Sequence, residues 1–197
     1  MQKQNIHIAS IKNIKLTRIL LLAGIFYGLY FRVGFSQVSQ EYLIKAVYIE
    51  KFTRFIEWPE HFSVNDTTKP FYIGIVGKSN MSTTLRDVYR KLRIRNKKVV
   101  IEEFSAMDDL KASGRKYHVL FVPPDSEEWL DDVIEFSVEN SILTIGDGND
   151  YAKRGVHINF IVFEDRVQYA INESSVYDSD LFMSYRLLNS ARIVGSD

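Results

Sequence analysis

Three histidines after residue 36 are the side chains best suited to acid–base or metal chemistry. His61, His118 and His157 stand far apart, and none belongs to the His-Glu-x-x-His pattern that places two ligands on one helix face. The chain has no cysteine, which excludes thiol nucleophiles, zinc ribbons and disulfides. No Gly-x-Ser-x-Gly turn presents a serine nucleophile, and no Gly-x-Gly-x-x-Gly fingerprint follows a strand. The sequence therefore predicts no catalytic residue, no metal site and no cofactor.

Polar side chains that follow two predicted strands could hold a small ligand. Gly77-Lys78-Ser79 is similar to the end of a phosphate-binding loop, but Tyr72 stands where the full motif requires a glycine. Ligands of open α/β sheets bind beyond the carboxyl ends of the strands. One hypothesis is therefore a small-molecule site at that edge, and the alternative is ordinary turns. The residues of this hypothetical site are Lys78, Ser79, Asn80, Asp147 and Asn149.

Aromatic side chains make up 13% of the chain, and several of them follow the first predicted helix. If they face inward they are core, and if they are partly exposed they form the apolar surface that is typical of a protein interface. Both alternatives stay open from the sequence. The residues expected at such an interface are Phe55, Glu57, Trp58 and Phe62.

The first 36 residues differ in composition from the rest. All of their charged residues are basic, and an apolar run over Ile19 to Phe31 ends in the small residues around Ser36. This order is typical of a secretory signal peptide, because the run is short for a membrane span. We expect cleavage near Ser36, with an uncleaved anchor as the alternative. The domain is then expected over residues 37–197, in the periplasm, where nucleic-acid binding is not expected.

Seven cations lie between positions 86 and 98. In an exported protein they suit anionic lipid head groups or an acidic partner, although a solvated surface is the simpler explanation. Contact with a membrane surface is therefore one hypothesis. The cations are Arg86, Arg90, Lys91, Arg93, Arg95, Lys97 and Lys98.

Alternating helix and strand patterns organise the rest of the chain. Apolar residues recur at helical spacing over 41–56 and 81–92, and short apolar runs at 71–77, 99–101, 118–122 and 142–145 predict buried strands. Strands that alternate with helices favour a mostly parallel sheet. Two further strands, 157–163 and 166–172, are separated by only two residues and predict an antiparallel hairpin. A last helix is expected from Ser175 to Ala191. The predicted fold is a three-layer α/β sandwich with this hairpin at one edge.

The order of these features resembles the YfiR-like family of exported proteins, from about Glu41 to Val194. The resemblance depends on Tyr42-Leu43-Ile44-Lys45-Ala46, on Glu57-Trp58-Pro59 and on later pieces: Ile75-Val76-Gly77, Leu143-Thr144-Ile145 before Asp147, Gly155 before Ile158-Asn159-Phe160, Ile171-Asn172, and Ser184 with Leu187-Leu188 and Ala191. The sequence differs from the usual family pattern in two ways. It has no cysteine, and it has Arg154-Gly155-Val156 where two glycines are usual.

The resemblance implies a periplasmic, often dimeric, non-catalytic α/β domain that represses a membrane-bound diguanylate cyclase by engaging its periplasmic region. The expected function is therefore a non-enzymatic regulator of a membrane signalling protein, a cyclase or a sensor kinase. Such a regulator needs only different affinities for two states of its partner. A small-molecule binding protein is the alternative.

Overall fold

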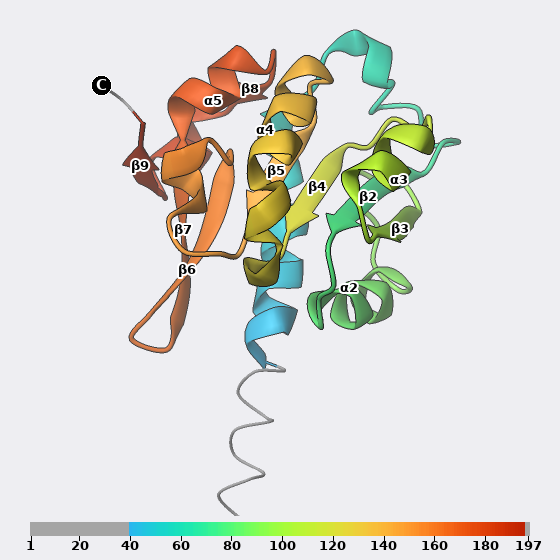
Figure 1. The fold of residues 1–197 in the computed structure, drawn as a ribbon. Coiled ribbons are helices and arrows are strands. Elements are labelled where there is room, and N and C mark those ends of the chain that lie inside the picture. The colour runs from blue at the N-terminus through green and yellow to red at the C-terminus, as the bar shows by residue number, and fades with distance from the viewer. Residues whose placement is uncertain (1–39, 196–197) are drawn as a thin grey trace, which may run out of the picture. The chain divides into compact units, whose positions relative to one another are not determined.

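A central sheet dominates the computed structural model, which describes residues 40–195 (Figure 1). The sheet is 7-stranded, with the order β3-β2-β4-β5-β6-β7-β9. Its parallel strands are β2 (Phe71–Val76), β3 (Val99–Phe104), β4 (Val119–Val122), β5 (Leu143–Gly146) and β6 (Ile158–Phe163). The predicted signal peptide, residues 1–36, lies outside the described residues.

The carboxy-terminal end of the sheet carries the predicted hairpin. Strand β7 (Arg166–Asn172) pairs antiparallel with β6, and the short strand β9 (Arg192–Val194) adds to its outer side in parallel. Both residues of the connection, Glu164 and Asp165, have positive φ, as a tight hairpin turn requires. The hairpin prediction is confirmed, and β9 is an additional strand at this edge.

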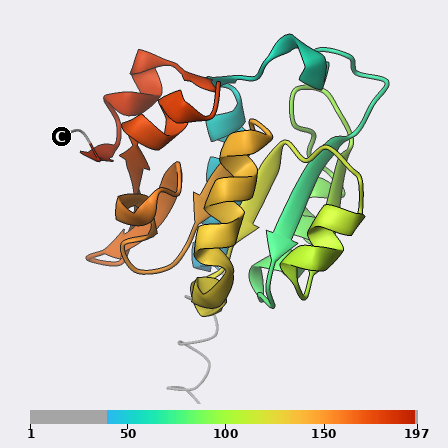
Figure 2. The same cartoon turned by 45° about the horizontal axis from the view of Figure 1, so that its top comes forward.

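Helices cover both faces of the sheet, as Figures 1 and 2 show. A helix over residues 40–53 and α2 (Met81–Tyr89) pack against one face, whereas α3 (Met107–Ala112) and α4 (Leu130–Glu139) pack against the other. Side chains of a strand point alternately to its two faces. In β4, Val119 accordingly joins the first core and Leu120 the second. The predicted three-layer α/β sandwich is confirmed.

Short elements connect these layers. They are β1 (Ile56–Glu57), η1 (Glu60–Phe62), η2 (Pro124–Trp129), η3 (Tyr151–Arg154), α5 (Glu173–Asp178), β8 (Phe182–Met183) and α6 (Tyr185–Leu188). Among the described residues, no helix has the length and apolar character that a bilayer crossing requires.

The long final helix expected from Ser175 to Ala191 is wrong. Asp180 adopts a left-handed conformation with φ of 55°, which ends the helical path after α5. Strand β8 follows, and Ser184 then caps α6 by accepting a hydrogen bond from the Arg186 amide. Pairing of β8 with β1 outweighs the helical spacing of the apolar residues in this segment.

Candidate functional site

Three aromatic side chains stand in solvent on the segment that replaces the expected helix. Tyr177 of α5, Phe182 of β8 and Tyr185 of α6 are 84%, 62% and 73% exposed. Folding explains none of these exposures, because an aromatic ring gains free energy when it leaves water. Exposed tyrosine and phenylalanine are typical of protein interfaces. We call these three residues the C-terminal aromatic surface.

The pairing of β1 with β8 places a carboxylate beside this surface. Ile56 lies opposite Met183, and Glu57 lies opposite Phe182. Ile56 and Met183 are buried, whereas Glu57 and Phe182 are exposed. Directly opposite residues in an antiparallel pair have neighbouring Cβ atoms on one face. The Glu57 carboxylate and the Phe182 ring therefore project together into solvent.

Of the four residues expected at an interface, Trp58 and Phe62 are buried. The Trp58 Nε1 donates a hydrogen bond of 3.2 Å to the His118 carbonyl, and its ring meets Phe71 edge-to-face at 6.0 Å between centroids. The sequence left core and interface open, and the structure places these two side chains in the core. Phe55 is partly buried against the same core, and Glu57 is exposed. A partner contact by any of the four stays a prediction.

A cavity of about 490 Å³ opens next to Glu57. One edge of Trp58 lines it, and the Arg95 guanidinium lies 5.7 Å from the centre of that ring. The other lining residues are Pro59, Glu60, Ser63, Val64, Asn65 and Asp66. Glu57 lines this cavity as well, so the exposed part of the Glu-Trp-Pro element forms one wall of a concave, polar surface.

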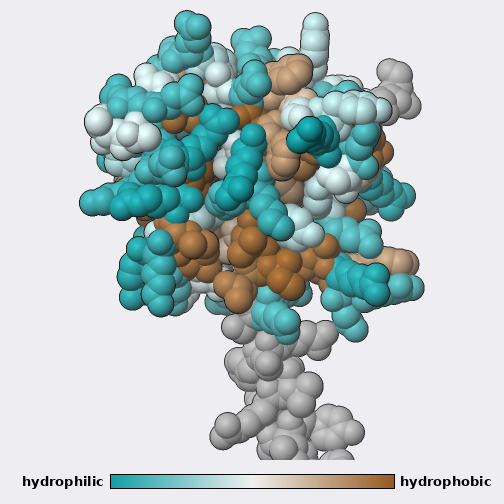
Figure 3. Space-filling model, turned by 180° about the vertical axis from the view of Figure 1, so that it is seen from behind, coloured by the Kyte–Doolittle hydropathy of each residue, from teal (hydrophilic) through white to brown (hydrophobic). Residues whose placement is uncertain are grey.

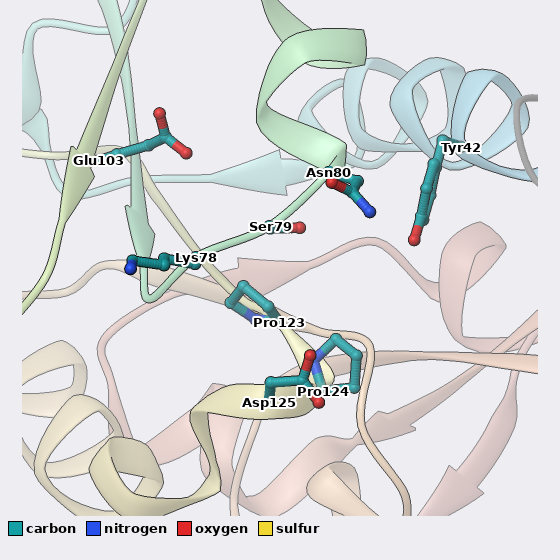
Figure 4. A pocket seen from close by; sticks show the side chains of 8 residues that line it. All are labelled: Tyr42, Lys78, Ser79, Asn80, Glu103, Pro123, Pro124 and Asp125. Atoms are coloured by element: carbon teal, nitrogen blue, oxygen red, sulfur yellow. The ribbon is translucent and has the colours of Figure 1, made fainter.

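A second cavity, of about 410 Å³, lies at the carboxyl edge of the sheet (Figure 4). Strand β3 lies on one side of β2 and β4 on the other, so this edge contains the point where the strand order reverses, a common ligand position. Lys78, Ser79 and Asn80 line the cavity, as the small-molecule hypothesis expects. The remaining lining residues are Tyr42, Glu103, Pro123, Pro124 and Asp125.

Asp147 and Asn149 do not line this cavity. The Asp147 carboxylate accepts a hydrogen bond of 2.5 Å from Lys45 Nζ, and both side chains are nearly buried. Lys45 comes from the helix over 40–53, far from Asp147 in the chain, so no local pattern predicts this ion pair. Three of the five residues of the hypothetical ligand site therefore line this cavity. Asp147 instead belongs to a nearly buried ion pair, and Asn149 follows it two residues later in the chain.

The two buried histidines occupy structural positions. Burial lowers the pKa of His157 to about 4, and its Nδ1 accepts the Thr144 amide at 2.9 Å. The proton of the neutral ring therefore sits on Nε2, which lies 2.9 Å from the Ser179 hydroxyl. A ring in this state cannot take a proton from Ser179 through Nε2. The pair does not form an activated nucleophile.

His118 is held in a similar way among aromatic rings. Burial, followed by the charge of Lys97, lowers its pKa to about 4. Its Nδ1 accepts the Tyr72 amide at 3.1 Å, and its ring stacks on Phe71 at 4.3 Å. Within residues 40–195, no group of three or more histidines and carboxylates could hold a metal ion.

A comparison with models of protein families finds a match over most of the described residues. The YfiR/HmsC-like model (DUF4154) matches residues 42–192, which include the sheet and the helices of both faces. The chain belongs to the YfiR/HmsC-like family. Members of this family are periplasmic, non-catalytic regulators of diguanylate cyclases. A comparison with curated proteins finds no match.

A second group of exposed apolar side chains lies on the helix over 40–53. Leu43, Ile44 and Val47 are partly exposed, and apolar side chains gather on the lower part of the rear face in Figure 3. Energetically dominant contacts in interfaces are enriched in tryptophan, tyrosine and arginine, whereas leucine and valine are under-represented. The C-terminal aromatic surface is therefore the stronger candidate for contact with a partner in this YfiR/HmsC-like protein.

Proposed function

We propose that this protein is an exported, non-enzymatic regulator that binds the periplasmic region of a membrane-bound diguanylate cyclase or sensor kinase. The observation that carries the proposal is the pairing of exposed Phe182 with exposed Glu57 on the β1–β8 ribbon. A ring and a carboxylate on one face offer a partner both an apolar contact and a charge. Family membership supports the class of partner.

The mechanism requires no chemistry from this chain. A regulator of this kind shifts its partner between two conformations by binding one of them more tightly. The exposed rings supply contact area at a low cost in conformational entropy, because each has only two side-chain torsions. The carboxylate of Glu57 then favours partners that present a cation or a hydrogen-bond donor at the matching position.

A photo-crosslinking experiment tests this surface. A benzophenone amino acid replaces Phe182 in one variant of the full chain and Phe163, a similarly exposed residue at the hairpin tip, in a control variant. After irradiation of intact cells, we expect position 182 to capture a membrane protein that carries a cyclase or kinase domain, and position 163 not to capture it. Equal capture at both positions, or capture only of soluble proteins, would refute the assignment. Capture of a second copy would assign the surface to a homodimer.

The cavity at the carboxyl edge favours the second candidate function, binding of a small molecule. Three residues of the sequence hypothesis, Lys78, Ser79 and Asn80, line it. A thermal-shift screen against periplasmic metabolites tests this function, with Asn80→Leu as the variant that fills the cavity. A ligand that raises the melting temperature of the wild type and not of Asn80→Leu would support it. A flat response across the screen would count against it.

A further inference from the structure

The seven cations between positions 86 and 98 divide into two groups in the structure. Arg86 donates to the Ile101 carbonyl at 2.8 Å and pairs with Glu103 at 2.9 Å. Arg90 pairs with Asp87 on the same helix. Arg86 therefore links α2 to β3, and Arg90 stabilises the end of α2.

Arg95 fixes the loop between α2 and β3 to the region of β1. Its Nε and Nη2 atoms donate to the carbonyls of Thr53 and Ile56 at 3.2 and 3.3 Å. Its guanidinium also lies over the Trp58 ring. Arg95 is therefore occupied by contacts within the fold.

Lys97 fixes the same loop from inside. It is fully buried, and its Nζ donates to the carbonyls of Ser63 and Asp66. Its backbone exchanges two hydrogen bonds with Ile94, which is also fully buried. These anchors hold the loop in one conformation.

The remaining cations, Lys91, Arg93 and Lys98, are exposed. Among residues 40–195 they form no ion pair. Leu92, which lies between two of them in the chain, is 48% exposed. Since the loop is anchored by its other residues, this side presents three unpaired cations around a leucine. We call Lys91, Leu92, Arg93 and Lys98 the basic loop face.

The basic loop face surrounds a hollow of about 210 Å³. Its lining residues are Tyr89, Arg90, Lys91, Leu92, Arg93, Lys98 and Val99, so every charged side chain that lines it is a cation. The chain after residue 36 carries 20 cations, which are the 25 of the full sequence minus five before residue 37, against 25 anions. Anions outnumber cations in this part of the chain, so attraction to an anionic surface comes from this local group of cations. The attraction would orient the basic loop face toward that surface.

We propose that the basic loop face is a docking surface for anionic phospholipid head groups. Lysine and arginine side chains contact lipid phosphates, while an apolar side chain between them enters the boundary between head groups and acyl chains. Leu92 among three unpaired cations has this arrangement. Docking would hold the regulator at the membrane whichever protein it binds there, so the proposal goes beyond the partner contact and does not depend on it.

Vesicle co-sedimentation tests the proposal with the purified full chain. The probes are vesicles of phosphatidylglycerol mixed with phosphatidylcholine, and vesicles of phosphatidylcholine alone. At low ionic strength we expect preferential binding to the anionic vesicles. The triple variant Lys91→Gln/Arg93→Gln/Lys98→Gln should weaken that binding by about tenfold or more, since each cation near an anionic surface contributes about 1 kcal/mol.

A matched control separates the local surface from net charge. Lys111→Gln/Lys116→Gln/Arg166→Gln removes three exposed cations elsewhere and should leave vesicle binding nearly unchanged. Leu92→Ser should weaken binding severalfold, including at raised ionic strength, because the leucine contribution is not electrostatic. All substituted side chains are exposed, so circular dichroism should show unaltered folding.

Three results would overturn the proposal. The first is absence of preferential binding to phosphatidylglycerol vesicles, and the second is an equal loss in the control triple variant. The third is normal vesicle binding by the Lys91/Arg93/Lys98 variant together with loss of attachment to native membranes, which would assign the basic loop face to an acidic protein instead of lipid.

Discussion

Two groups of aromatic side chains meet at the β1–β8 pair and differ in their surroundings. Trp58 lies among Phe71 and His118, with its indole nitrogen hydrogen-bonded. Phe182 and Tyr185, close to it in the fold, stand in solvent. The first group stabilises the domain. The second gains no stabilisation from burial within the fold, which makes it the better candidate for contact with another molecule.

The largest expected effect distinguishes the two groups by stability. Trp58→Ala should destabilise the domain by about 3–5 kcal/mol, because it leaves a cavity and removes one of the two hydrogen bonds that the His118 carbonyl accepts. Thermal unfolding followed by circular dichroism measures this as a lower melting temperature. Tyr185→Ala is the matched control and should change stability by less than about 0.5 kcal/mol. A small effect of Trp58→Ala would show that Trp58 is not a core residue.

An intermediate effect concerns the histidine of the buried group. The unfolded chain binds a proton at the ordinary histidine pKa of 6.5, whereas burial lowers the pKa of His118 to about 4 in the folded chain. Acid therefore favours the unfolded chain, and stability that is complete above pH 6.5 is lost as the pH falls toward 4. His118 should account for about 2.5 kcal/mol of the loss between about pH 7 and about pH 4.5.

Urea unfolding at several pH values measures that loss. His118→Gln should reduce the slope of stability against pH, and His157→Gln should do so as well, since burial also lowers the pKa of His157 to about 4. An unchanged slope in both buried variants would contradict the assignment of the acid sensitivity to these rings.

The smallest effect on stability is expected for the exposed group. Phe182→Ser/Tyr185→Ser should alter the free energy of unfolding by less than about 0.5 kcal/mol per position, yet should abolish capture of the membrane partner. To measure this, a benzophenone amino acid replaces Tyr177, and crosslinking is compared in the presence and absence of the double substitution. If capture persists, the partner contacts another surface.

Most of the fold could be predicted because hydrophobic periodicity determines it locally. The buried strands begin and end within a few residues of their predicted positions, since continuous apolar runs between turns have few other solutions. The final helix was wrong for a tertiary reason. Tyr177, Leu181 and Leu188 have helical spacing, but the chain turns at Asp180 and pairs with β1 instead.

The candidate site was less predictable, because exposure depends on distant segments. The Glu-Trp-Pro element draws attention in the sequence, yet the structure buries its tryptophan under Arg95 and exposes Phe182 opposite Glu57. Asp147 and Lys45 are far apart in the chain, so their ion pair could not be read from spacing. In the segment where a long final helix is expected, Asp178-Ser179-Asp180 is a turn-forming sequence and is a local signal against a continuous helix.

The three-residue strand β9 has a consequence for aggregation. It pairs with Ala170 to Asn172, the last three residues of β7, which would otherwise present unpaired amide and carbonyl groups. Unpaired strand edges of this kind recruit strands from other molecules. The hydroxyl of Ser174 bonds the Gly195 carbonyl just after β9, which helps to hold that short cover in place. Loss of the last few residues should therefore change the melting temperature less than it increases aggregation. A shortened protein is expected to form oligomers or fibres through the uncovered part of β7.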